Sequence, residues 1–138
     1  MIGIVIVTHK HLGDALIEAA EFILGDRPVS VESISIDLHQ EAEKLRSNIA
    51  DTIKKVDQKD GVLILTDMFG GTPSNLSYSF LEEGRVEVLS GVNLPILIKA
   101  LNLRKDAELN KLAVCLESAG KKSISLASGI LKGNKRSE

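Results

Sequence analysis

The chain has few aromatic residues and almost no sulfur. Of its 138 residues none is Trp, aromatic residues make up 3%, and Cys115 is the single cysteine. One cysteine excludes an internal disulfide and an all-cysteine metal site. The core must therefore be aliphatic, built from Ile, Leu, Val and Ala. Because free cysteines are usually buried and Cys115 lies in an apolar stretch, we expect it in the core.

The sequence also lacks a strong charge of one sign and a long hydrophobic run. The formal net charge of −2 argues against nucleic acid or an anionic membrane as a partner. The opening apolar run, residues 2–8, is too short for a signal-peptide core or a membrane span, and no basic region precedes it. We therefore expect a cytoplasmic protein with one domain over residues 1–131 and a flexible basic tail over residues 132–138.

Strand-like and helix-like segments alternate along the chain. Apolar runs and two-residue alternation predict strands at residues 2–8, 29–36, 62–66 and 86–89. Apolar residues at three-to-four spacing predict helices at residues 12–24, 40–56, 72–82, 93–101 and 106–118. Such alternation predicts an α/β fold, a three-layer sandwich in which helices cover both faces of a mainly parallel sheet. We expect the strand order 2-1-3-4, with a late edge strand over residues 123–128.

A histidine and an aspartate follow the first and third predicted strands. His9 comes directly after the first run and Asp67 directly after the third, Val62 to Thr66. These two strands are neighbours in the predicted order, and the topological switch point falls between them. We therefore expect His9 and Asp67 to meet at the carboxyl edge of the sheet. A carboxylate on Nδ1 of the histidine would leave Nε2 free as a nucleophile.

A glycine-rich turn follows the aspartate. Gly70, Gly71 and Thr72 lie between the third strand and the next predicted helix, and Thr72-Pro73 has the composition of an N-cap followed by a first-turn proline. Backbone amides at such a position suit a phosphoryl group. Together with His9 and Asp67 this predicts a phosphoryl carrier. Mere turn chemistry is the simpler explanation of the two glycines taken alone.

The motifs resemble one known family over residues 1 to about 130. Val7-Thr8-His9, the stretch Thr66-Asp67-Met68-Phe69-Gly70-Gly71-Thr72-Pro73-Ser74-Asn75 and Ser90-Gly91-Val92-Asn93-Leu94-Pro95 are similar to the IIA component of the mannose-type sugar phosphotransferase system. The long middle stretch is the specific part, since a histidine alone would not distinguish the family.

The resemblance implies a function and a set of partners. In that family the histidine corresponding to His9 is phosphorylated on Nε2 by the phosphocarrier protein HPr, and a IIB component then takes the phosphoryl group for sugar uptake through membrane IIC and IID components. The family aspartate corresponds to Asp67. The resemblance also implies a homodimer in which an antiparallel edge strand is exchanged; residues 123–128 could supply it. Thr66, Phe69 and Asn93 are expected to border the pocket.

Other functions stay open at this point. A regulatory phosphoprotein without a transport role would use the same histidine, and the phosphocarrier subunit of dihydroxyacetone kinase shares the fold. A binding module that never meets phosphate is a third alternative. No nucleotide loop, nucleophile elbow or zinc motif is present. We expect neither cofactor nor metal, because phosphohistidine is already an activated donor. The sugar is not encoded in this chain.

Overall fold

A computed structural model describes residues 1–37 and 39–132. Its described residues form one parallel sheet of four strands in the order β2-β1-β3-β4. The strands are β1 (Gly3–His9), β2 (Val31–Ile36), β3 (Val62–Thr66) and β4 (Val86–Ser90). The predicted α/β class and strand order are both confirmed. The predicted flexible tail lies outside the described residues, except Lys132.

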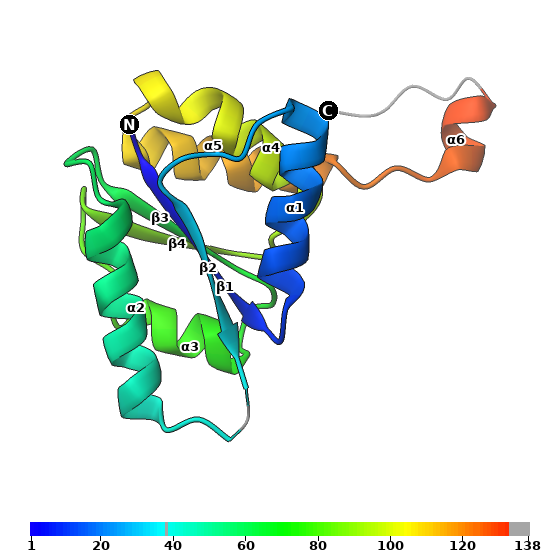
Figure 1. Ribbon diagram of the computed structural model, residues 1–138. Helices are drawn as coiled ribbons and strands as arrows, with labels where there is room; N and C mark the ends of the chain where they lie inside the picture. Colours follow the sequence, from blue (N-terminus) through cyan, green and yellow to red (C-terminus); the bar gives the residue numbers. More distant parts are fainter. Residues whose placement is uncertain (38, 133–138) are drawn as a thin grey trace.

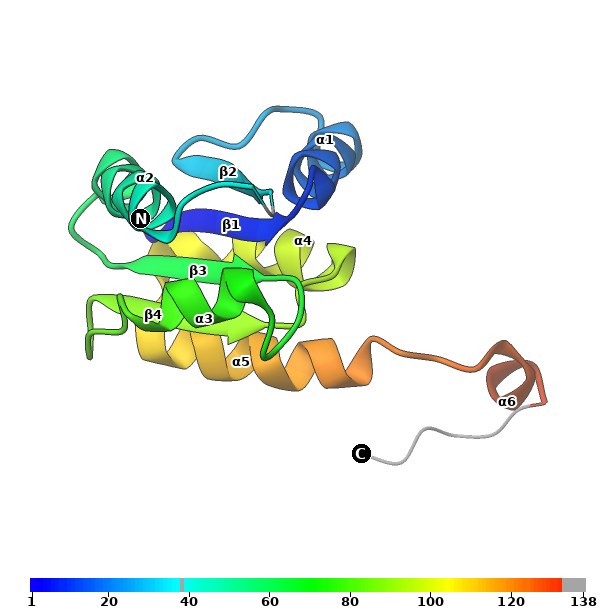
Figure 2. The same cartoon turned by 90° about the horizontal axis from the view of Figure 1, so that it is seen from below.

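Helices cover both faces of the sheet (Figures 1 and 2). Helices α2 (Ala42–Val56) and α3 (Thr72–Tyr78) lie on one face, and α1 (Leu12–Leu24), α4 (Leu94–Leu103) and α5 (Leu109–Lys122) lie on the other. A short 3-10 helix, Arg104–Asp106, joins α4 to α5. None of the helices in the described part of the chain is long and apolar enough to cross a membrane.

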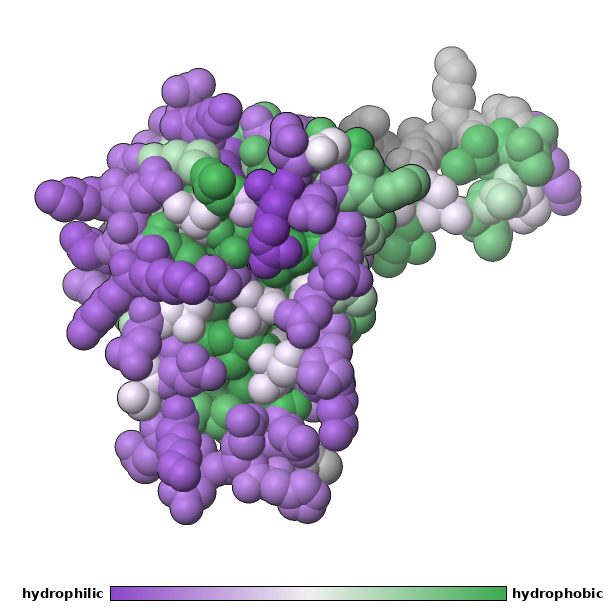
Figure 3. Space-filling view, viewed as in Figure 1, coloured by the Kyte–Doolittle hydropathy of each residue, from purple (hydrophilic) through white to green (hydrophobic). Residues whose placement is uncertain are grey.

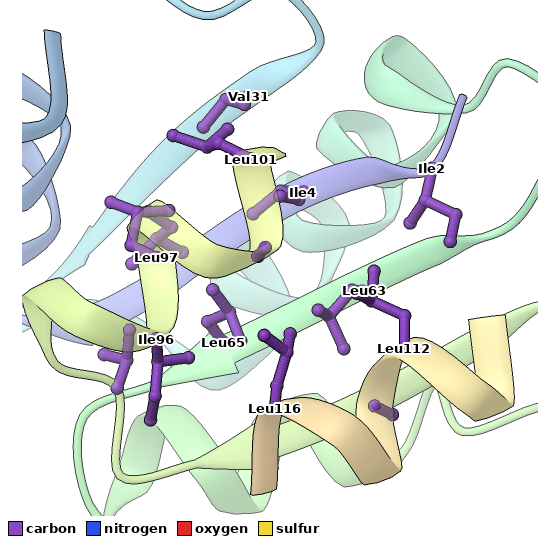
Figure 4. Close-up of a cluster of buried hydrophobic side chains, with 14 of the residues drawn as sticks. Ile2, Ile4, Val31, Leu63, Leu65, Ile96, Leu97, Leu101, Leu112 and Leu116 are labelled. Carbon is purple, nitrogen blue, oxygen red and sulfur yellow. The ribbon is translucent and has the colours of Figure 1, made fainter. Parts of the chain in front are cut away.

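The two-residue period of the strands divides the core in two. Ile4 and Ile6 of β1 face α1, α4 and α5, whereas Val5 and Val7 face α2 and α3. Figure 4 shows the first of these clusters, in which Leu112 and Leu116 of α5 reach the sheet beside Leu63. Because both faces are covered, the central strands β1 and β3 are apolar up to their carboxyl ends, where their polar residues lie.

A glycine and an arginine close the amino-terminal edge of the sheet. A Cβ at Gly3 would lie 2.3 Å from the carbonyl oxygen of Val56, so only glycine fits there without a shift of the backbone. The buried guanidinium of Arg104 donates to the carbonyl oxygen of Val29 at 2.6 Å. Burial lowers the pKa of Arg104. Both contacts are at the edge opposite the predicted site.

Cys115 does not lie in the core. It is exposed, because it lies outside the buried stripe of α5. That stripe is formed by Leu109, Leu112, Ala113 and Leu116. The apolar stretch around Cys115 therefore gave a wrong expectation. A position on a helix is buried by its angle around the axis and not by the hydrophobicity of its sequence neighbours.

The expected late edge strand is also absent from the described chain. Residues 124–126 form neither helix nor strand, and a short helix, α6 (Ala127–Leu131), follows them. The chain runs on from α5 away from the sheet instead of turning back along β4 (Figure 2). Figure 3 shows hydrophobic residues along this projecting arm, residues 124–131, in which Ile124, Leu126 and Leu131 are largely exposed.

Candidate functional site

His9 is the last residue of β1 and lies at the carboxyl edge of the sheet. The buried Thr8 hydroxyl accepts a hydrogen bond from the Gly13 amide at 2.9 Å, which fixes the start of α1 beside the strand end. The next residue, Lys10, has a left-handed φ of 50°, and its amide donates to the carbonyl oxygen of Ile36. The chain thus turns sharply after His9 and leaves the imidazole at the rim of the sheet.

Asp67 holds the histidine at two points. One carboxylate oxygen, Oδ2, lies 2.8 Å from Nδ1 of His9 and also accepts a hydrogen bond of 2.9 Å from the His9 amide. The other, Oδ1, accepts a bond of 2.9 Å from the Met68 amide. The carboxylate is well covered, with a side chain 11% exposed, whereas the imidazole is 41% exposed. The predicted pairing of His9 and Asp67 across β1 and β3 therefore exists in the structure.

These contacts keep the carboxyl group of Asp67 ionised. Burial alone raises its pKa, but hydrogen bonds from the His9 amide and ring, the charge of the ring and the Met68 amide outweigh burial. The net effect is a pKa of Asp67 below its ordinary value of 3.8. An ionised carboxylate can only accept, so Nδ1 must carry the hydrogen.

The arrangement selects one nitrogen for chemistry. With Nδ1–H donated to Asp67, the lone pair of the neutral ring belongs to Nε2. No residue among 1–37 and 39–132 gives Nε2 a hydrogen bond, and the half-exposed ring can be reached from outside. A carboxylate at Nδ1 also stabilises positive charge that develops on the ring when Nε2 forms a new bond. The site is therefore suited to nucleophilic chemistry at Nε2.

The glycine turn lies against the histidine ring. A Cβ at Gly71 would lie 3.0 Å from Cε1 of His9 and 3.2 Å from Cγ of Met68, so the missing side chain permits the close approach. Gly70 has a left-handed φ of 83°. The Gly71 amide donates a long hydrogen bond of 3.4 Å to the carbonyl oxygen of Met68. The structure thus brings Gly71, one of the two predicted glycines, to the predicted histidine.

Thr72 does not cap the helix. It is the first residue of α3, Gly71 is the N-cap with extended backbone, and no side-chain bond to a cap is found within the described residues. The helix also ends at Tyr78, earlier than residue 82. The Thr-Pro pair marked the helix start correctly within one residue, but the hydroxyl is one position too late to cap it.

The three expected pocket residues have different environments. Thr66 is fully buried. Phe69 is 80% exposed and its ring lies 5.9 Å from that of Tyr78. Asn93 caps α4, because its Oδ1 accepts from the Ile96 amide at 2.9 Å. Phe69 and Asn93 line an open pocket of about 470 Å³ beside β4, which does not include His9 or Asp67.

A cluster of hydroxyl groups beneath the glycine turn was not predicted. Thr66, Ser74 and Ser90 have their hydroxyl oxygens 2.6 to 3.0 Å apart, and Tyr78 reaches Ser90 at 3.3 Å. Thr66 and Ser90 are the last residues of β3 and β4 and are partners in the parallel register. The sequence alone shows that two neighbouring strands each end in a hydroxyl residue. It does not show that Ser74 lies beside them, because that contact depends on the fold.

The depressed pKa of Asp67 predicts how stability depends on pH. An acid whose pKa is lower in the folded than in the unfolded chain stabilises the fold above its ordinary pKa, and this contribution is lost as pH falls through the folded value. We expect the difference in free energy of unfolding between the wild type and Asp67→Asn to shrink between about pH 5 and pH 2. Urea denaturation at each pH measures it. Asp51→Asn, at an exposed position of α2, controls for the loss of one charge. A difference independent of pH in this range would contradict the assignment.

The chain is similar to known proteins over most of its length. Residues 3–115 match the family described as PTS system fructose IIA component. The PTS system fructose-specific EIIA component of Bacillus subtilis is 31% identical over 129 residues, which cover 93% of this chain and 88% of the relative. The PTS system mannose-specific EIIAB component of Escherichia coli is 35% identical over 128 residues, which cover 89% of this chain but 39% of that longer protein.

A solved structure supports the same assignment. The phosphotransferase system component EIIA of Streptococcus agalactiae superposes with a TM-score of 0.82 at 27% identity, over 93% of this chain and 98% of the other. The resemblance inferred from the His9 and Asp67 motifs is thereby confirmed, and the chain belongs to the mannose-type family of sugar phosphotransferase-system IIA components.

Proposed function

We propose that this chain is a phosphocarrier that accepts a phosphoryl group from HPr on Nε2 of His9 and passes it to a IIB component during sugar uptake. The observation that carries the proposal is the 2.8 Å contact between Nδ1 of His9 and Oδ2 of Asp67, with Nε2 left open. Relatives named as fructose- and mannose-specific components support the transport role. The link to membrane IIC and IID components would be indirect, through IIB, and the carrier would act in the cytoplasm.

The transfer is a displacement between two imidazoles. The lone pair of Nε2 attacks the phosphorus of the donor phosphohistidine, a nitrogen–phosphorus bond forms, and the donor imidazole leaves with the electrons of the bond that breaks. The proton on Nδ1 stays between His9 and Asp67, and the carboxylate stabilises the charge that develops on the ring. The step onto IIB reverses these roles. The chain of transfers requires neither nucleotide nor metal.

The turn before α3 would receive the phosphoryl oxygens. The group brings about two negative charges. Backbone amides of Gly70, Gly71 and Thr72 and the Thr72 hydroxyl are the donors nearest in sequence to the ring contact at Gly71. Since the Gly71 amide has only a long bond to the Met68 carbonyl, a stronger acceptor can replace it.

Mass spectrometry of the intact protein tests the carrier role. After incubation with Enzyme I, HPr and phosphoenolpyruvate, we expect the wild type to gain one acid-labile phosphoryl group and His9→Ala to gain none, because the accepting nitrogen is removed. His11→Ala is the matched control, since His11 lies two residues on with an 81% exposed side chain.

Two results would contradict the proposal. One is a wild type that stays unmodified beside a second IIA protein that is phosphorylated in the same mixture. The other is a His9→Ala variant that is still modified. A phosphorylated chain that is not discharged by any IIB component would instead favour the regulatory alternative.

We further propose that the chain is a homodimer in which residues 123–128 of one copy lie along β4 of the other. β4 is an edge of the sheet formed by the described residues, and such an edge offers unpaired backbone groups to an added strand. Ile124 and Leu126 are 82% and 77% exposed and have the alternation of a strand with one apolar face.

Sedimentation analysis tests the exchanged segment. We expect the wild type to sediment as a dimer and the double variant Ile124→Asp with Leu126→Asp as a monomer, because the charges would have to be buried against the partner. Phe22→Asp, at an 89% exposed position of α1, should leave the dimer intact. A monomeric wild type, or a dimer that the double variant does not weaken, would contradict the arrangement.

A further inference from the structure

The hydroxyl cluster beneath the active-site turn has a fixed direction. The Ser74 hydroxyl lies 2.6 Å from the carbonyl oxygen of Met68, which can only accept, so the single proton of Ser74 points to that carbonyl. The Thr66 hydroxyl donates to Ser90 at 2.9 Å, and in its own contact with Ser90, at 3.0 Å, Ser74 must then be the acceptor. The protons of the cluster are thus directed through Ser74 toward the backbone of Met68.

Met68 connects this cluster to the histidine. Its amide donates to Oδ1 of Asp67 at 2.9 Å, and Oδ2 of the same carboxylate holds both Nδ1 and the amide of His9. Its carbonyl oxygen accepts from Ser74 and, more weakly, from the Gly71 amide that lies against the His9 ring. Met68 is therefore held on one side by Asp67 and on the other by Ser74.

We infer that Ser74 is a positioning residue for phosphoryl transfer, acting through Met68 on the orientation of Asp67 and on the close approach of Gly71 to His9. The inference rests on the function proposed for His9. Ser74 is fully buried and contacts none of the reacting atoms itself. Its hydroxyl makes the shorter of the two hydrogen bonds to the Met68 carbonyl oxygen, since the bond from the Gly71 amide is 3.4 Å long.

The helix offers a matched control for removal of this hydroxyl. Ser77 is also fully buried in α3, but its hydroxyl donates to the carbonyl oxygen of Pro73 within the same helix, at 2.6 Å. Ser74→Ala and Ser77→Ala each remove one buried hydroxyl from α3. They differ in that only the first releases the turn that carries Met68.

Two readouts test the inference. The first is the rate of His9 phosphorylation by phospho-HPr, which we expect to fall about 10-fold or more in Ser74→Ala, because small misplacements of reacting groups are costly. The second is the set of ¹⁵N shifts of the His9 ring in the unphosphorylated protein. We expect one tautomer, protonated on Nδ1, in the wild type and in Ser77→Ala, and a mixture of tautomers in Ser74→Ala.

The outcomes separate positioning from stability. Wild-type rate and ring shifts in Ser74→Ala would overturn the inference, and so would equal losses in Ser74→Ala and Ser77→Ala. Ser74→Cys keeps the volume but has a weak donor, and it decides in the same way should Ser74→Ala fail to fold. If the wild type is not phosphorylated at all, the proposed function fails, but the ring shifts still decide whether Ser74 orients the Asp67–His9 pair.

Discussion

The hydrogen bond between Asp67 and His9 is the contact on which the site depends. It joins the ends of two strands that are 58 residues apart in sequence, and it determines which ring nitrogen is free. The carboxylate can serve this role because the amides of His9 and Met68 keep it ionised although it is mostly covered. Once the carboxylate is ionised and oriented, the proposed transfer depends on whether the phosphoryl donor can reach the half-exposed imidazole.

The fold supplies this contact through its strand order. β1 lies between β2 and β3, so its carboxyl end is flanked by the end of β3 at the switch point of the sheet. Parallel register pairs Val7 with Thr66, which puts the following residues of both strands at one rim. Apolar side chains fill both faces of β1 and β3, and the sheet thereby holds the two polar ends in place without taking part in the chemistry.

The sequence was sufficient for the features that follow from periodicity. The apolar runs predicted the strands and their order, and the order brought His9 to Asp67 without a further assumption. The sequence was insufficient where the environment of a side chain depends on tertiary contacts. Cys115 lies off the buried stripe of α5, and Ser74 reaches Met68 only because α3 begins where it does. Alternation at residues 123–128 signalled a strand, but alternation does not say whether the chain turns back along the sheet.

The most direct test of the central claim is the nitrogen to which phosphorus is bonded. The ¹⁵N–³¹P couplings of the phosphorylated, ¹⁵N-labelled protein identify that atom in the His9 ring. The account predicts phosphorus on Nε2, with Nδ1 still protonated and facing Asp67. Phosphorus on Nδ1 would contradict it, because Asp67 could not then hold the proton that leaves Nε2 free.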